Sequence, residues 1–177
     1  MTSNDSNTRA GGAGRPLLIR VTAGSGAGQT TLAAFDSALR AAGVADHNLI
    51  RLSSIIPAGS TVTVSSAQEQ LRGEFGDILY CVYAVAFATE RDDEAWSGVG
   101  WSRATDGSGR GLFVEHVGHA EEHVRHMITL SLSDMNDGRD DDFELENMVL
   151  SSAHCDGPPA CSIVVATYRT AGWGTGE

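Results

Sequence analysis

The chain has 177 residues, 41% of them hydrophobic, so it can bury the core of one domain and is too short for two of ordinary size. Its formal net charge of −11 repels the phosphate backbone of nucleic acids and favours a small cationic ligand. All twelve Lys and Arg positions are arginine. The absence of lysine excludes the Schiff-base anchor of pyridoxal phosphate and the phosphate-binding lysine of a P-loop.

The two ends of the chain are polar and rich in glycine. Residues 1–16 contain no apolar core of a secretion signal and are predicted to be a disordered lead-in. The longest apolar run, residues 78–88, is shorter than the roughly 20 residues that cross a membrane as a helix. We therefore expect a soluble, cytoplasmic protein without a membrane segment, with one domain over residues 17–170 and a flexible tail over 171–177.

The hydrophobic pattern predicts strands interspersed with two helices. Alternation over residues 17–22 indicates a first strand, followed by a Gly-rich loop at 23–29 and a helix that Thr30 or Thr31 caps and Gly43 ends. An extended stretch follows at 48–57. Further strands are predicted at 61–65, 78–88, 98–104, 111–117, 144–154 and 160–169, and the second helix at 119–135. This order predicts an α/β (α+β) fold.

The Gly-rich loop, AGSGAGQT, has the spacing of a phosphate-binding loop between a strand and a helix. Gln29 stands where that motif requires lysine, and it also occupies the third glycine position of the dinucleotide-binding pattern. A plain tight turn between strand and helix is the favoured interpretation.

A histidine-rich segment begins at His116. His119 to His123 matches the H-x-x-E-H pattern of certain zinc peptidases, and with His116 and His126 it would form one helical stripe if the helix started early enough. A distant third metal ligand has no evident candidate. The three cysteines, Cys81, Cys155 and Cys161, include no C-x-x-C pair, so they are predicted to be buried thiols and not a disulfide framework or zinc site. A solvated helix face is favoured for the histidines, and no metal is expected.

A pair of serines, Ser53 and Ser54, stands inside the apolar segment NLIRLSSIIP, residues 48–57. On its own, such a pair is also typical of strand-end serines that bond to the backbone. The stretch from Ala23 to Pro57, with the motif NLIR-x-SSI-x-P, closely resembles the pyruvoyl-dependent arginine decarboxylases. Weaker similarity continues through GLFVEHVG, residues 111–118, to the C-terminal strand.

The resemblance implies a proenzyme that cleaves itself between Ser53 and Ser54. The hydroxyl of Ser54 would attack the carbonyl of Ser53, and elimination would leave Ser53 as a new C-terminus and convert Ser54 into a covalent pyruvoyl group, since only a residue with a β-oxygen leaving group can react in this way. Asn48 is implied to assist the processing. Six residues of straight strand span roughly 20 Å, so Asn48 would have to reach Ser54 through a bend or from another subunit.

Glu115 is the candidate proton donor. It shares a strand face with Phe113 and Val117, and burial there favours the neutral carboxyl form that a general acid requires. A strand-end glutamate paired with an arginine is the alternative. The similarity of FVEHVG to the family's proton-donor segment favours Glu115 as the donor to the carbon that loses CO₂.

Asp36 lies on the first predicted helix, where an i, i+4 ion pair with Arg40 is the simple interpretation. The resemblance instead implies that Asp36 binds the guanidinium of the substrate, in the bidentate geometry that suits arginine.

As a whole, the resemblance implies a four-layer αββα sandwich cleaved into a β chain, 1–53, and an α chain, 54–177. It also implies trimers or dimers of trimers with active sites between subunits, and conversion of L-arginine to agmatine and CO₂ for polyamine synthesis. The alternatives are decarboxylation of another amino acid, a homologue that neither cleaves nor catalyses, and a zinc peptidase built on His119 and His123.

Overall fold

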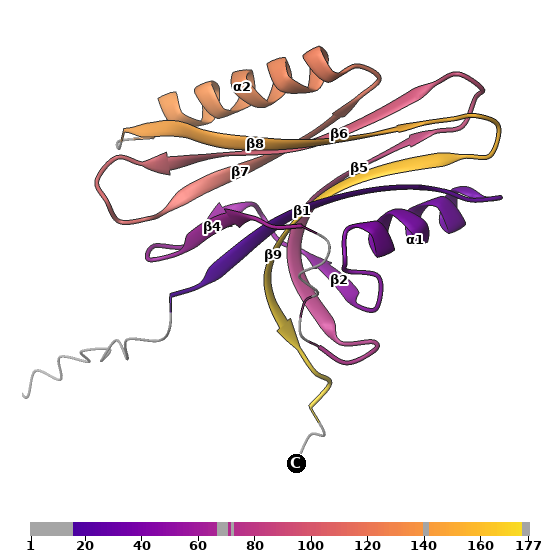
Figure 1. Ribbon diagram of the computed structural model, residues 1–177. Coiled ribbons are helices and arrows are strands. Elements are labelled where there is room, and N and C mark those ends of the chain that lie inside the picture. Colours follow the sequence, from indigo (N-terminus) through magenta and orange to yellow (C-terminus); the bar gives the residue numbers. More distant parts are fainter. Residues whose placement is uncertain (1–15, 67–70, 72, 140–141, 175–177) are drawn as a thin grey trace, which may run out of the picture.

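The computed structural model describes residues 16–66, 71, 73–139 and 142–174 (Figure 1). These residues contain two helices, α1 (Thr31–Ala41) and α2 (Glu121–Asp137). The strands are β1 (Leu18–Ala27), β2 (Asn48–Arg51), β3 (Ile55–Ile56), β4 (Thr61–Val64), β5 (Ile78–Ala88), β6 (Glu94–Ala104), β7 (Gly111–Gly118), β8 (Phe143–His154) and β9 (Ala160–Ala171). The predicted mixed α/β class is confirmed.

The strands form two sheets. The first has the order β2-β5-β9-β1-β4 and the second the order β3-β7-β6-β8. Long antiparallel pairs dominate both, whereas the short outer strands β2 and β4 run parallel to their neighbours. The sheets face each other across an apolar core with Ile19, Val82 and Val164 from the first sheet and Val99 and Phe113 from the second.

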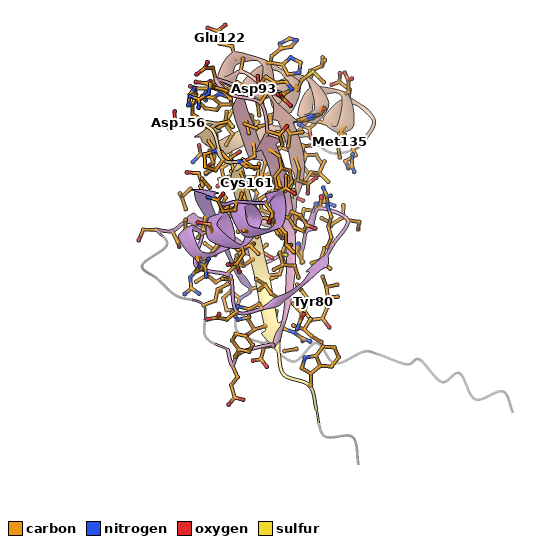
Figure 2. All side chains as sticks on the ribbon, turned by 90° about the vertical axis from the view of Figure 1, so that its right-hand side faces the viewer. Tyr80, Asp93, Glu122, Met135, Asp156 and Cys161 are labelled. Atoms are coloured by element: carbon orange, nitrogen blue, oxygen red, sulfur yellow. The ribbon has the colours of Figure 1, made fainter. Side chains whose placement is uncertain are left out.

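Each helix covers the outer face of one sheet. On α1, Ala34, Ala38 and Leu39 pack with residues of β5 and β9 such as Cys81 and Ile163. On α2, the buried residues Val124, Ile128 and Leu132 pack on Leu112 and Val114 of β7. Figure 1 shows α2 above the second sheet and α1 below the first. In the view of Figure 2, Glu122 and Met135 lie on α2 at one end of the stack, and Cys161 lies beside α1. Within the described residues, neither helix has the length and apolar character needed to cross a membrane.

The prediction of a Gly-rich loop at residues 23–29 is wrong for its first part, because residues 23–27 continue β1 and pair with β9 as far as Ala27. The glycines there serve helix packing. A Cβ on Gly24 would lie 2.4 Å from the carbonyl oxygen of Ala38, and one on Gly26 would lie 2.5 Å from the Ser37 hydroxyl. The sequence pattern missed the strand because its small residues conceal the alternation, whereas the close approach of α1 requires them. Thr30 caps α1 as predicted, accepting a hydrogen bond from the Ala33 N–H at 3.1 Å.

The extended stretch predicted at 48–57 is in fact two strands that belong to different sheets. β2 lies at one edge of the first sheet, and β3 pairs with β7 at one edge of the second. The chain therefore crosses between the sheets at residues 52–54, which is where the two serines lie.

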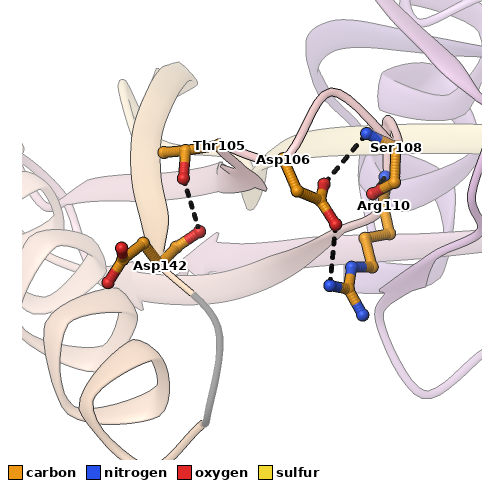
Figure 3. Close-up of polar contacts among 5 residues, drawn as sticks. All are labelled: Thr105, Asp106, Ser108, Arg110 and Asp142. Atoms are coloured by element: carbon orange, nitrogen blue, oxygen red, sulfur yellow. Dashed lines mark hydrogen bonds and ion pairs between the residues drawn. The ribbon is translucent and has the colours of Figure 1, made fainter.

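The hairpin between β6 and β7 fixes the start of β7. Asp106 accepts a hydrogen bond from the Ser108 N–H at 2.9 Å and pairs with Arg110 at 2.8 Å (Figure 3). The bonds from Ser108, and then the Arg110 charge, lower the pKa of the exposed Asp106 carboxyl. Thr105 contacts the Asp142 carbonyl just before β8, which ties the neighbouring strand to the same turn. This end of the second sheet is thereby held in register.

Other predicted boundaries need small corrections. β6 begins at Glu94 instead of residue 98, and α2 begins at Glu121 and ends at Asp137 instead of spanning 119–135. β9 continues to Ala171, so the start of the predicted tail is strand. Of the lead-in predicted at 1–16, residues 1–15 lie outside the described part of the chain, as do residues 175–177 of the predicted tail. The three cysteines are free and buried, as predicted.

Candidate functional site

Ser54 has an unusual backbone conformation. Its φ is 65°, in the left-handed region that a residue with a Cβ rarely adopts. Ser53 before it is exposed, and Ser54 itself is half-buried. Conformations of this kind cost of order 1–2 kcal/mol and persist where the surrounding structure imposes them. Here the pairing of β2 and β3 with different sheets imposes the bend.

The Ser54 hydroxyl donates a hydrogen bond to Oε1 of Glu115. Glu115 lies on β7, opposite Val99 of β6, on the face that points between the sheets. Its side chain is 13% exposed. A carboxylate with this little exposure is a strong acceptor, since few waters compete for it. The structure thus brings two predicted site residues into direct contact, although 61 positions separate them in the sequence.

The main-chain carbonyls of Ser54 and Ile55 each accept a hydrogen bond. The N–H of Phe113 donates to the Ser54 carbonyl at 2.8 Å, and the Tyr168 hydroxyl donates to the Ile55 carbonyl at 2.9 Å. Burial, and then the charge of Glu115, raise the pKa of Tyr168 well above its ordinary value, so this phenol stays a donor. Tyr168 also contacts the edge of Phe113, with ring centroids 6.2 Å apart. Residues 54 and 55 are therefore fixed from both sheets.

An arginine faces the same carboxylate. Nη2 of Arg51, the last residue of β2, lies 3.9 Å from Oε2 of Glu115. The guanidinium carbon lies 5.1 Å from the ring centroid of Tyr83, a cation–π contact. The Leu52 N–H donates to the Cys81 carbonyl at 2.9 Å. The chain is consequently anchored to the first sheet up to the residue before Ser53.

Two predicted site residues lie elsewhere in the chain. Nδ2 of Asn48 donates to the Gly76 carbonyl at 2.6 Å, at the far end of β2 from Ser54. Asp36, on α1, pairs with Arg40 at 2.5 Å, as the simple interpretation of that helix expected. A single chain does not bring either residue to Ser54.

The histidines do not form a stripe. His116 lies on β7 and contacts the Ser131 hydroxyl at 2.8 Å, and His119 precedes α2 and contacts the Glu94 carbonyl at 3.2 Å. Burial is the main reason that the pKa of His116 is lowered, so its ring is neutral near neutral pH. Among the described residues, no group of three or more His, Cys, Asp and Glu side chains is arranged to hold a metal ion.

The arrangement is suited to proton transfer at a serine hydroxyl. The hydroxyl, a partly buried carboxylate and a strained peptide linkage lie together, and nearby donors hold the backbone carbonyls. Sequence reasoning missed Arg51 and Tyr168. Arg51 does stand inside the motif NLIR, which was the available signal, whereas Tyr168 is one of several alternating residues of the last strand and carries no distinguishing signal.

Comparisons with known proteins agree on one family. The family model "Pyruvoyl-dependent arginine decarboxylase" matches residues 18–171. A pyruvoyl-dependent arginine decarboxylase of Halobacterium salinarum is 34% identical over 152 residues, which cover 85% of this chain and 92% of the relative. Pyruvoyl-dependent arginine decarboxylase 2 of Archaeoglobus fulgidus is 32% identical over 117 residues, covering 63% of this chain and 73% of the relative.

Proposed function

The chain belongs to the pyruvoyl-dependent arginine decarboxylase family, and we propose that it converts L-arginine to agmatine and CO₂ with a pyruvoyl group made from its own Ser54. The contact between the Ser54 hydroxyl and Glu115, at a bent Ser53–Ser54 linkage, carries the proposal. As a carboxy-lyase of this family, the enzyme needs no lysine for its electron sink, which agrees with a chain that contains none.

Self-cleavage begins at the Ser54 hydroxyl. Glu115 accepts the Oγ proton as Oγ attacks the Ser53 carbonyl, and the proton then passes to the departing nitrogen, so that an ester replaces the amide. Removal of the Cα proton of Ser54 breaks the bond between Cβ and Oγ and releases Ser53 as a carboxylate. One water then replaces the nitrogen at residue 54, which leaves as ammonia. The products are a β chain of residues 1–53 and an α chain of residues 54–177.

The surroundings of Ser54 suit this conversion. The left-handed conformation strains the intact linkage, and cleavage removes that strain because residue 54 then has no backbone nitrogen and a planar carbon. The Leu52 N–H and the Phe113 N–H hold the two sides of the break on different sheets. Both new chain ends can therefore stay in place without a covalent link.

A pyruvoyl group at residue 54 supplies the carbonyl that binds the substrate amine and accepts the electrons left by CO₂. Beside that group, the Phe113 N–H donates to the main-chain carbonyl of residue 54. We assign to Glu115, which contacts the Ser54 hydroxyl, the donation of a proton to the substrate carbon. We assign substrate guanidinium binding to Asp36 and help in processing to Asn48, each from a neighbouring subunit. This assignment requires the oligomer expected for the family, a trimer or a dimer of trimers, in which each αββα unit completes the site of the next.

Intact mass and a denaturing gel test the cleavage. Wild type is expected to give a fragment that ends at Ser53 and a second fragment whose N-terminus is blocked at residue 54, and Ser54→Ala is expected to stay intact. An intact wild-type chain after prolonged incubation would make this form a non-cleaving homologue.

A CO₂-release assay tests the substrate. The cleaved enzyme is assayed separately with arginine, ornithine, lysine, histidine and aspartate. The expected product from arginine is agmatine, identified by mass. The ion pair between Asp36 and Arg40 gives a reason to test other amino acids, because Arg40 competes with a substrate guanidinium for the same carboxylate. Release of CO₂ from another substrate with none from arginine would replace arginine as the substrate.

A further inference from the structure

Arg51 lies at the site but has no role in the proposed cleavage or decarboxylation. It ends β2, two residues before the cleavage point, and its Nη2 is 3.9 Å from Oε2 of Glu115. The Ser54 hydroxyl contacts the other oxygen of Glu115. The buried carboxylate therefore lies between the nucleophile and a cation.

The other titratable groups around this site lie on β5, β7 and β9. Tyr168 on β9 is held neutral by burial. His116, next to Glu115 on β7, is directed to Ser131 of α2. Cys81 on β5 keeps its proton, because burial raises the pKa of this thiol to about 12. Among these described neighbours, Arg51 is the group that carries a charge near neutral pH.

A largely buried carboxylate loses much of its hydration, which disfavours the charged form unless a cation compensates. Only the charged form can accept the Ser54 proton. We propose that Arg51 is a positioning residue for self-cleavage, which holds Glu115 as the carboxylate that accepts the Ser54 proton, and that the Ser53 carboxylate created by cleavage then draws the guanidinium away. This inference rests on the proposed self-cleavage.

The geometry of the chain allows Arg51 to leave Glu115 and to pair with the new carboxylate of Ser53. Two residues of extended chain span about 7 Å, so the new carboxylate forms within reach of the long Arg51 side chain. Ser53 is exposed and the Arg51 side chain is 55% exposed, so both can rearrange, and a terminal carboxylate can make a direct bidentate pair in place of the loose contact with Glu115. Glu115 then faces a new anion without its cation, so the charge nearest to its carboxyl group changes sign between self-cleavage and decarboxylation. One residue thus acts first as a base and later as an acid.

The test measures the rate of self-cleavage of full-length proenzyme against pH, by intact mass. In Arg51→Gln, self-cleavage is expected to be about tenfold slower than in wild type at the acid end of the profile and to approach the wild-type rate at high pH. Arg51→Lys keeps the charge and is expected to retain most of the wild-type profile. The control is Arg125→Gln, which removes the same charge from a half-exposed ion pair with Glu121 on α2 and is expected to leave the profile unchanged.

A second readout tests the exchange of partners. Arg51→Gln is cleaved to completion at high pH, and the pH dependence of kcat/KM for arginine is measured. Because the guanidinium has left Glu115 in the mature enzyme, the shift of this profile is expected to be less than half of the shift in cleavage. Circular dichroism checks that the variants fold, which the exposure of Arg51 favours.

The outcomes are separable. An intact wild-type chain overturns the proposed function, and the role of Arg51 with it. Cleaving wild type with an unshifted Arg51→Gln profile overturns only the role of Arg51. Equal shifts in cleavage and decarboxylation would mean that Arg51 stays on Glu115, which overturns the exchange.

Discussion

Glu115 illustrates how a single carboxylate acquires its chemistry from its neighbours. It receives a hydrogen bond from Ser54 on one oxygen and faces Arg51 at 3.9 Å on the other. One contact comes from the segment that crosses between the sheets, and the other comes from the last residue of β2 just before it. The side chain would be an ordinary strand residue without that crossing.

Replacing Glu115 by Gln removes the proton acceptor and preserves the shape of the side chain. Because general-base catalysis contributes about 10²–10⁴-fold, we expect self-cleavage to slow by at least about a hundredfold. The measurement is the fraction of intact chain against time by mass spectrometry. Glu122→Gln, on the first turn of α2, is the matched control. Cleavage of Glu115→Gln at the wild-type rate would exclude Glu115 as the base.

Tyr168→Phe removes the hydrogen bond to the Ile55 carbonyl. We expect a loss of about 1 kcal/mol in the free energy of unfolding, and a slowing of cleavage by less than tenfold, since the phenol positions the backbone and does not touch the Ser54 hydroxyl. Urea unfolding in a Ser54→Ala background, which stays uncleaved, measures the first effect. A larger effect on cleavage than that of Glu115→Gln would contradict a positioning role.

At the scale of elements, the contact between β1 and α1 depends on glycine. Gly24→Ala would place a methyl group 2.4 Å from the Ala38 carbonyl oxygen, so strand or helix must move. We expect a destabilisation of about 2 kcal/mol, measured by urea unfolding. Gly138→Ala is the control, because its nearest neighbours would be 3.8 Å away and its φ of −83° suits alanine. Equal stability of the two variants would show that α1 packs less tightly on β1 than the structure indicates.

At the scale of the whole molecule, Asp36 lies away from Ser54 in one chain, so the proposed site needs residues from two subunits of an oligomer. Asp36→Asn is expected to cleave itself and to decarboxylate poorly, and Ser54→Ala to do neither. If one subunit supplies residue 54 and another supplies Asp36, co-expression of the two variants restores part of the activity through mixed oligomers. Analytical ultracentrifugation of each variant confirms that the oligomers form. No restoration in a mixed oligomer would place both residues in the same subunit's site.

The buried thiols make stability depend on alkaline pH. Burial raises the pKa of Cys81 from 9.0 to about 12 and that of Cys161 to about 11. Below pH 9 both the folded and unfolded chains keep these protons, whereas above it the unfolded chain loses them first, so stability falls as pH rises. We expect Cys81 alone to contribute a loss of about 1 kcal/mol between pH 9 and 10.

Urea unfolding at a series of pH values, under reducing conditions, measures this dependence. Cys81→Ala is expected to reduce the slope, whatever its effect on stability at neutral pH. A slope identical to that of wild type would show that the Cys81 thiol ionises as readily in the folded protein as in the unfolded chain.

Local sequence patterns alone predicted most of the secondary structure and the segment that contains the candidate site. Alternating hydrophobic residues predicted most strands, Thr30 and Gly43 marked the limits of α1, and the motif around Ser53 and Ser54 carried the family resemblance from which self-cleavage is proposed. These features need only neighbouring residues, because strand periodicity, helix capping and the β-oxygen of serine are local properties.

Only the tertiary structure decided which residues meet. The pairing of β3 with β7 brings Glu115 to Ser54 across 61 positions, and the split of residues 48–57 between two sheets bends the backbone at Ser54 and turns Arg51 toward the same carboxylate. The glycines of β1 give a sequence that is typical of a loop, and only the packing of α1 on them explains why they lie in a strand. Long-range strand pairing and close packing depend on the whole fold, and no local pattern encodes them.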